Sequence, residues 1–141
     1  LRANFTGISS MHTSAHFARS VMEGVALSLL DCKEYLISKG LDISGEAFAI
    51  GGGAKSELWS SILADVLNIT LLKTKNNDSS FGSAMLAGIY AGFFSDMQNA
   101  VDKCCIITGK VKPDSKNSDI YREIFKKYKK IQKAMEEIYN A

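Results

Sequence analysis

Apolar residues recur at every third or fourth position from about Thr13 to Lys39, and this period predicts a long amphipathic helix. Thr13 or Ser14 is expected to cap its start, and Gly40 to end it. Two neighbouring lines of side chains form the expected buried stripe, with Phe17, Val21, Val25 and Leu29 on one line and Ala18, Met22, Ala26 and Leu30 beside it.

Two short apolar runs predict buried strands at 46–50 and 69–72. A second helical pattern lies between them and begins at Lys55 or Ser56. The residues expected to face inward are Leu58, Trp59, Ile62, Leu63, Val66 and Leu67. A strand, a helix and a second strand in this order are typical of parallel strands joined by a helical crossover.

Further helices are predicted in the second half of the chain. A polar, turn-rich segment at 73–80 leads into one from about Ser79 to Phe94, and a short helix follows near 96–103. The pair Thr108-Gly109 is expected to form a turn.

Lys112-Pro113-Asp114 predicts a reversal of the chain, after which Ser118 is expected to cap a last helix ending near Tyr139. The order of these elements predicts an α/β fold in which short, mostly parallel strands pack with long helices.

Composition narrows the class of protein. The 141 residues suit one domain or a large part of one, and 46% hydrophobic with 23% charged residues is typical of a soluble globule. The formal net charge is only +2, and the lysines crowd the last helix. We therefore expect a solvated basic face, with no nucleic acid and no membrane as partner. No apolar run approaches the ~18 residues that span a membrane.

The three cysteines, Cys32, Cys104 and Cys105, show no zinc-binding spacing. Reduced thiols are typical of cytoplasmic proteins, so a cytoplasmic location is expected.

Three consecutive glycines, Gly51 to Gly53, follow the first predicted strand and precede the second helix. Backbone without Cβ atoms allows positive φ and close approach of a ligand, and a helix start favours an anion. The segment is neither a P-loop nor a GxGxxG motif. On the residues alone, a phosphate site and a tight structural turn remain equally open, and Lys55 is either a phosphate contact or a solvated side chain.

Other candidate chemistry is weak. His12 and His16 lie one helical turn apart, but no carboxylate or third nitrogen accompanies them, so capping or packing is expected rather than a metal site. Glu23, Asp31 and Asp65 have no partner acid at catalytic spacing. No catalytic residue and no metal ligand is therefore predicted in this chain.

Four segments in order resemble the FGGY carbohydrate kinases, and within them the xylulose kinases most closely. Residues 7–29 are similar to the family helix HTRAHLxRAVLEGVAFSL, and residues 51–67 to its nucleotide loop GGGAKSxLWxQIxADVL. Residues 81–88 match LGAAxLAG, and the segment from Val111 to Asp114 with the following helix resembles the carboxyl-terminal tyrosine-spaced region.

The resemblance implies the later part of an actin-like, RNase H-like ATPase domain. Residues 1–141 would form the C-terminal, nucleotide-binding portion of a sugar kinase whose N-terminal sugar-binding domain is absent. Such enzymes transfer the γ-phosphoryl group of Mg²⁺-bound ATP to a sugar hydroxyl, here that of xylulose, with an aspartate as base. That aspartate and the sugar pocket are expected upstream of Leu1, and the Mg²⁺ ligands are expected outside this chain.

The resemblance also implies which residues touch the nucleotide. Gly52, Gly53 and Ala54 would lie against the phosphates and ribose, Lys55 and Ser56 would line the mouth of the loop, and Glu57 would sit beside the adenosine. The adenine pocket would be flanked by small residues, among them Ala84. The predicted cofactor-binding residues are thus Gly51, Gly52, Gly53, Ala54, Lys55, Ser56, Glu57 and Ala84.

Two alternatives stay open. The first is a kinase of another sugar or polyol, such as gluconate, glycerol, ribulose or fuculose, because sugar specificity resides upstream in the family. The second is a non-catalytic nucleotide-binding module of actin-like fold. The oligomeric state is also open, with a homodimer among the options.

Overall fold

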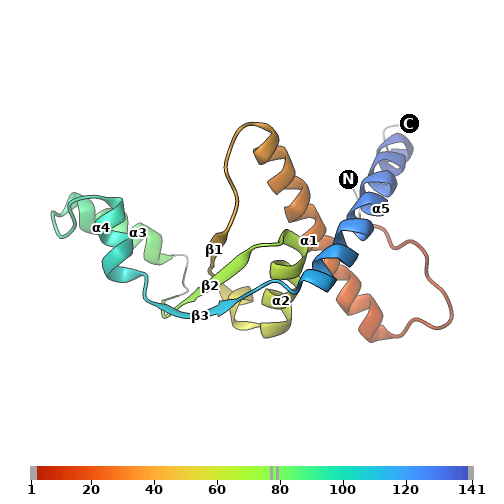
Figure 1. Ribbon diagram of the computed structural model, residues 1–141, viewed down its shortest axis with the longest axis horizontal. Helices are drawn as coiled ribbons and strands as arrows, with labels where there is room; N and C mark the ends of the chain where they lie inside the picture. The colour runs from red at the N-terminus through yellow and green to blue at the C-terminus, as the bar shows by residue number, and fades with distance from the viewer. Residues whose placement is uncertain (1–2, 77, 79, 140–141) are drawn as a thin grey trace.

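The computed structural model describes residues 3–76, 78 and 80–139, which form a mixed α/β arrangement (Figure 1). The elements in chain order are α1 (Ser14–Ser38), β1 (Glu46–Ala49), the 3₁₀ turn η1 (Gly52–Lys55), α2 (Glu57–Leu67), β2 (Thr70–Thr74), α3 (Ser80–Tyr90), α4 (Met97–Cys104), β3 (Ile107–Val111) and α5 (Ser115–Tyr139).

The sheet has the strand order β1-β2-β3. β1 and β2 are parallel, as predicted, with Ala47 opposite Leu71. β3 runs antiparallel to β2, and Gly109 lies opposite Lys73. The turn predicted at Thr108-Gly109 is therefore wrong, because both residues lie inside a strand. Among the described residues, β1 and β3 form the two edges of the sheet.

α2 is the centre of the packing. One group of buried residues joins it to α1 and α5, namely Ala26, Leu27, Ile62, Val66, Tyr121 and Phe125. A second group joins its other face to the sheet and comprises Ala64, Ile69 and Leu71, with Ala47, Ala49 and Val111 packed against them. The helix thus lies between the sheet and the two long helices.

The α1 stripe is narrower than predicted. Ala26 and Leu27 are buried, and Met22 and Leu30 pack beside them. The line through Val21, Val25 and Leu29 was expected to be buried, but these side chains are 43% to 54% exposed. Leu58 of α2 was likewise expected to face inward and is 49% exposed. Both errors concern apolar positions that no described segment covers.

The start of α5 is fixed by a buried carboxylate on α2. Asp65, only 8% exposed, accepts hydrogen bonds from the Asp114 N–H at 2.8 Å and the Asn117 side-chain amide at 2.9 Å. The Ser118 hydroxyl donates to the Asp65 carbonyl. Asp114 itself caps the helix by accepting from Lys116 N–H at 2.8 Å. The predicted cap at Ser118 is therefore wrong, since Ser118 lies within the helix.

α3 and α4 pack against each other and extend to one side of the sheet (Figure 1). α3 ends at Tyr90 rather than at Phe94. Its predicted start at Ser79 lies outside the described residues. None of the helices in the described ranges is long and apolar enough to cross a membrane.

Candidate functional site

The glycine segment forms a strand–turn–helix junction. Gly51 has φ +84° and ψ −178°, a conformation that is essentially restricted to glycine. The chain then enters η1, where Ala54 N–H donates to the Gly51 carbonyl at 3.2 Å and Ser56 N–H to the Gly53 carbonyl at 3.0 Å. The sequence therefore predicted both the turn and the reason for a glycine at its first position.

Two backbone donors of this turn remain available. Within the part of the chain that the structure describes, the N–H groups of Gly52 and Gly53 have no acceptor. Gly52 and Gly53 are both exposed, and no atom lies within 4 Å of the place where a Cβ of Gly52 would stand. Adjacent N–H groups without an acceptor, on exposed residues directly ahead of a helix start, suit an anion.

α2 begins immediately after this turn. Ser56 is its cap, because its Oγ accepts from the Trp59 N–H at 3.2 Å. The hydroxyl of Ser60, which is 1% exposed, donates to the Ser56 carbonyl at 2.8 Å. Glu57 is exposed on the first turn. The positive end of the α2 dipole therefore faces the two glycines.

Gly53 touches the helix that it precedes. A Cβ at this position would lie 3.1 Å from both Cδ1 and Nε1 of Trp59. Trp59 was predicted to face inward, and it does pack against the core shared by α1, α2 and α5. Its contact with the turn was not predicted, because residue spacing alone does not show how far an indole reaches.

The remaining predicted residues are placed differently. Ala54 is buried beneath the turn, whereas Lys55 is exposed. The Ser80 N–H bond, at 2.8 Å, is the main cause that lowers the pKa of Asp78, and the Lys55 charge contributes to the same shift. Ala84 is exposed further along α3, which packs with α4.

The two histidines form local hydrogen bonds. His12 Nδ1 accepts from the Ser9 N–H at 2.9 Å, and His16 Nδ1 accepts from the Thr13 N–H at 3.1 Å. Thr13 is the cap of α1, so the capping role predicted for His16 is confirmed. In residues 3–76, 78 and 80–139, no group of three or more His, Cys, Asp or Glu residues could hold a metal ion.

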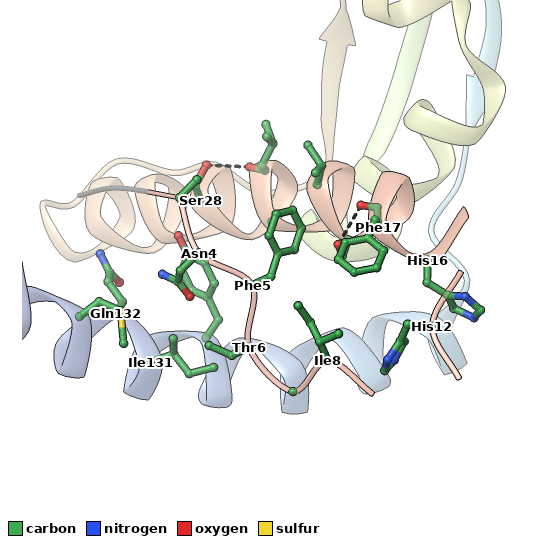
Figure 2. A pocket seen from close by; sticks show the side chains of 18 residues that line it. Asn4, Phe5, Thr6, Ile8, His12, His16, Phe17, Ser28, Ile131 and Gln132 are labelled. Atoms are coloured by element: carbon green, nitrogen blue, oxygen red, sulfur yellow. Dashed lines mark hydrogen bonds between the residues drawn. The ribbon is translucent and has the colours of Figure 1, made fainter. Parts of the chain in front are cut away.

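A cavity lies elsewhere, between the segment 3–8, α1 and α5, and has a volume of about 500 Å³. Figure 2 shows Phe5 and Ile8 extending into the space between the two helices. Its walls are mostly apolar, but the buried Oε1 of Gln132 receives no hydrogen bond from the described residues. None of the predicted nucleotide-contact residues lines this cavity, so the candidate nucleotide site and the cavity are separate features.

Known proteins resemble this chain over almost its whole length. The xylulose kinase of Staphylococcus epidermidis is 32% identical over 139 residues, which is 98% of this chain and 28% of that protein. The glycerol kinase of Myxococcus xanthus is 36% identical over 121 residues, or 82% of this chain and 24% of the relative. This chain thus spans about a quarter of the length of these relatives.

A solved structure agrees with the sequence comparison. The ligand-bound xylulose kinase from Lactobacillus acidophilus superposes with a TM-score of 0.83 at 25% identity, covering 96% of this chain and 27% of that one. The predicted fold class, an actin-like ATPase fold with a small sheet and long helices, is confirmed. Residues 1–91 match the C-terminal domain of the FGGY family of carbohydrate kinases, and the chain belongs to that family.

Proposed function

We propose that this chain supplies the adenine-nucleotide-binding part of an ATP-dependent sugar kinase. The full-length protein would convert xylulose and ATP to xylulose 5-phosphate and ADP. The observation that carries the proposal is the Gly51–Gly53 turn, which presents two unused N–H groups at the start of α2 within the family-matching segment.

Each residue of the turn has a role in this proposal. The N–H groups of Gly52 and Gly53 bind phosphate oxygens, and Gly51 turns the chain away from β1 so that these groups face outward. Lys55 adds positive charge beside the turn. Ser56 caps α2 by accepting a hydrogen bond from the Trp59 N–H. Glu57 is suited to ribose hydroxyl groups rather than to phosphate, because carboxylates repel anions and accept hydrogen bonds.

Ala84 completes the proposed contact set as part of an adenine pocket. It is exposed on α3. A small side chain there leaves room for a flat base. The α3–α4 pair would then border the nucleotide on the side opposite α2.

Catalysis requires groups that this chain is not proposed to supply. Phosphoryl transfer depends on positioning and on neutralising charge, with Mg²⁺ bridging phosphate oxygens and a base orienting the acceptor hydroxyl. The turn has donors for phosphate, whereas the described residues hold no acidic cluster for the metal. We assign the catalytic aspartate and the sugar pocket to an N-terminal part of the kinase and the Mg²⁺ ligands to residues outside this chain, and we expect the isolated chain to be inactive.

The cavity between the segment 3–8, α1 and α5 supports the proposal that the chain is a portion of a larger kinase. Val21 and Val25, which line it, are about half exposed, and Leu29 beside them is 43% exposed. A longer polypeptide would cover such surfaces. The free state of the three cysteines agrees with a cytoplasmic location, which is part of the proposal.

The binding half of the proposal is tested by calorimetry on the 141-residue chain with a non-hydrolysable ATP analogue and Mg²⁺. We expect saturable, weak binding that Gly52→Asp abolishes, because an added carboxylate repels phosphate. We also expect no transfer of phosphate to xylulose. Phosphorylation of xylulose by the isolated chain at the rate of an intact relative would contradict the proposal that the catalytic aspartate and the sugar pocket lie in another part of the kinase.

A chimera tests the kinase half. This chain would replace the matching segment of the Staphylococcus epidermidis xylulose kinase, with the unmodified enzyme as control. Activity of the chimera on xylulose is the expected result, and its loss in a Gly52→Asp chimera would tie that activity to the turn. A folded chimera with no affinity for nucleotide would contradict the proposal.

A second candidate keeps the family and changes the acceptor to glycerol. The similarity to the Myxococcus xanthus glycerol kinase favours it, since identity is higher there, although over a shorter stretch. A panel of xylulose, glycerol and gluconate with the full-length kinase separates the two.

A further inference from the structure

The only tryptophan in the chain links the glycine turn to the core. Trp59 stands on the first turn of α2 and packs against the buried residues of α1, α2 and α5. The Cδ1 and Nε1 edge of the same ring lies 3.1 Å from the position that a Gly53 Cβ would occupy. One large side chain therefore contacts both the core and the turn.

The two glycines that carry unused N–H groups differ in this respect. A Cβ on Gly52 would meet nothing within 4 Å, whereas a Cβ on Gly53 would press on the indole. A Cβ at 3.1 Å requires the indole to give by a few tenths of an ångström. Because the ring packs against the core, we expect it to resist that shift and the Gly53 backbone to move instead. The direction of its N–H group therefore depends on the tryptophan beneath it.

We propose that Trp59 is a positioning residue for nucleotide binding, because its ring packs against Gly53 and limits how far the turn can move toward the core. The indole edge determines how deep the turn lies, and hence where the Gly52 and Gly53 N–H groups meet phosphate oxygens. The inference rests on the proposed function for the identity of the ligand, whereas the contact between ring and turn stands without it.

Dependence between the two positions is the signature of this role. Alanine at position 53 should be harmful only while the pyrrole edge of Trp59 is present. Phenylalanine at position 59 keeps a ring in the core but lacks that edge, and leucine removes the ring. A general weakening of the turn would give the same loss in every background.

The experiment is a double-mutant cycle on the 141-residue chain. Gly53→Ala, Trp59→Phe and the double variant are compared with the parent by calorimetric titration with a non-hydrolysable ATP analogue. Gly53→Ala should weaken binding about tenfold in the parent and less than about threefold in the Trp59→Phe background, a difference that is ordinary for residues in contact. Trp59→Leu serves as a second background, and unfolding midpoints confirm that each variant is folded.

Gly52→Ala is the matched control. It adds the same methyl group one residue away, where no atom is within 4 Å. Its effect on binding should be the same in the parent as in the Trp59→Phe background. The fluorescence emission of Trp59 in the parent should also change when the ATP analogue is added, since the chain has no second tryptophan. The dissociation constant from this change should equal the one from calorimetry.

Two results would overturn the inference and they are distinguishable. Equal losses from Gly53→Ala in both backgrounds, with binding intact in the parent, would remove the role of Trp59 and leave the proposed function standing. If the parent binds no nucleotide, the proposed function fails and this role fails with it. In that case the cycle in unfolding midpoints would still show whether the ring and the turn are in contact.

Discussion

The two ends of α2 have opposite relations to the rest of the molecule. At its start, Glu57 and Leu58 are exposed, and the glycine turn ahead of them has N–H groups without acceptors among the described residues. From its midpoint to its far end, Ile62, Ala64 and Val66 are buried between the sheet and the long helices. The comparison shows how one helix can present an exposed binding end in a fixed position, because its other end is held by two groups of core residues.

The largest effect is expected at the buried end. Ile62 is 1% exposed and lies in the core shared by α1, α2 and α5, so Ile62→Ala should lower the free energy of unfolding by about 2–5 kcal/mol. Chemical denaturation measures the loss. Ile62→Val, which removes one methylene group, is the control and should cost about 0.5–1.5 kcal/mol. Equal costs for both would show that the far end of α2 is not tightly packed.

Asp65 should come next. Asp65→Ala removes the acceptor for Asp114 N–H and the Asn117 amide and frees the start of α5, at a cost of about 2–3 kcal/mol. Asp65→Asn keeps one acceptor oxygen, so it should lower the free energy of unfolding by less than Asp65→Ala does. Urea unfolding and the helical circular dichroism signal follow the change. If Asp65→Ala left the free energy of unfolding unchanged, α5 would be held by apolar contacts alone.

Gly51 tests the turn that precedes the exposed start of α2. With φ +84° and ψ −178°, Gly51→Ala forces a residue with a Cβ into a glycine conformation, at about 1–3 kcal/mol. Nucleotide affinity should fall with stability, because the turn and the strand exit share this residue. Gly52→Ala, with no positive φ, should leave the unfolding midpoint nearly unchanged. A Gly51→Ala variant as stable as the parent would contradict the strained geometry.

The smallest effect is expected at the exposed start. Glu57→Gln removes a negative charge from the first turn of α2, where it interacts favourably with the helix dipole. Stability should fall slightly at low salt and not at all at high salt, since solvent ions screen exposed charges. Nucleotide affinity should rise, because the phosphates lose an anionic neighbour while the amide oxygen still accepts from a ribose hydroxyl. A large loss of stability would show that this end is also structural.

Periodicity predicted the helices better than it predicted which face of each is buried. The helix expected from Thr13 to Lys39 is α1 almost to the residue. Its two apolar lines were equivalent in sequence, yet Ala26 is buried and Val25 is 48% exposed. A period shows that a face is apolar, while the partner that covers it comes from elsewhere in the fold.

Non-local pairing explains the strand that was missed. Thr108 and Gly109 have turn-forming character, but in β3 they pair with β2, and the Thr108 hydroxyl donates to the Lys73 carbonyl at 3.3 Å. The start of α5 was misplaced for a similar reason. Ser118 is a good cap by type, but Asp114 comes earlier and its carboxylate accepts from Lys116 N–H. A distant partner in the sequence, or an earlier competing cap, is not visible in a local pattern.

In the candidate site, the local features were predictable and the reach of side chains was not. Three glycines before a helix indicated the turn, and Gly51 has the positive φ that only glycine readily adopts. The contact of Trp59 with Gly53 and the influence of Lys55 on Asp78 depend on distances that only the folded chain determines.

The unpaired side of β1 has a consequence for the behaviour of the protein in solution. β1 pairs with β2 on one side only among the described strands, and Phe48 on it is 46% exposed. Open backbone beside apolar side chains can accept a strand from a neighbouring molecule. Association of this kind obeys mass action, so light scattering and apparent melting temperature should rise with protein concentration. Charged substitutions such as Phe48→Lys should lower that dependence and improve solubility.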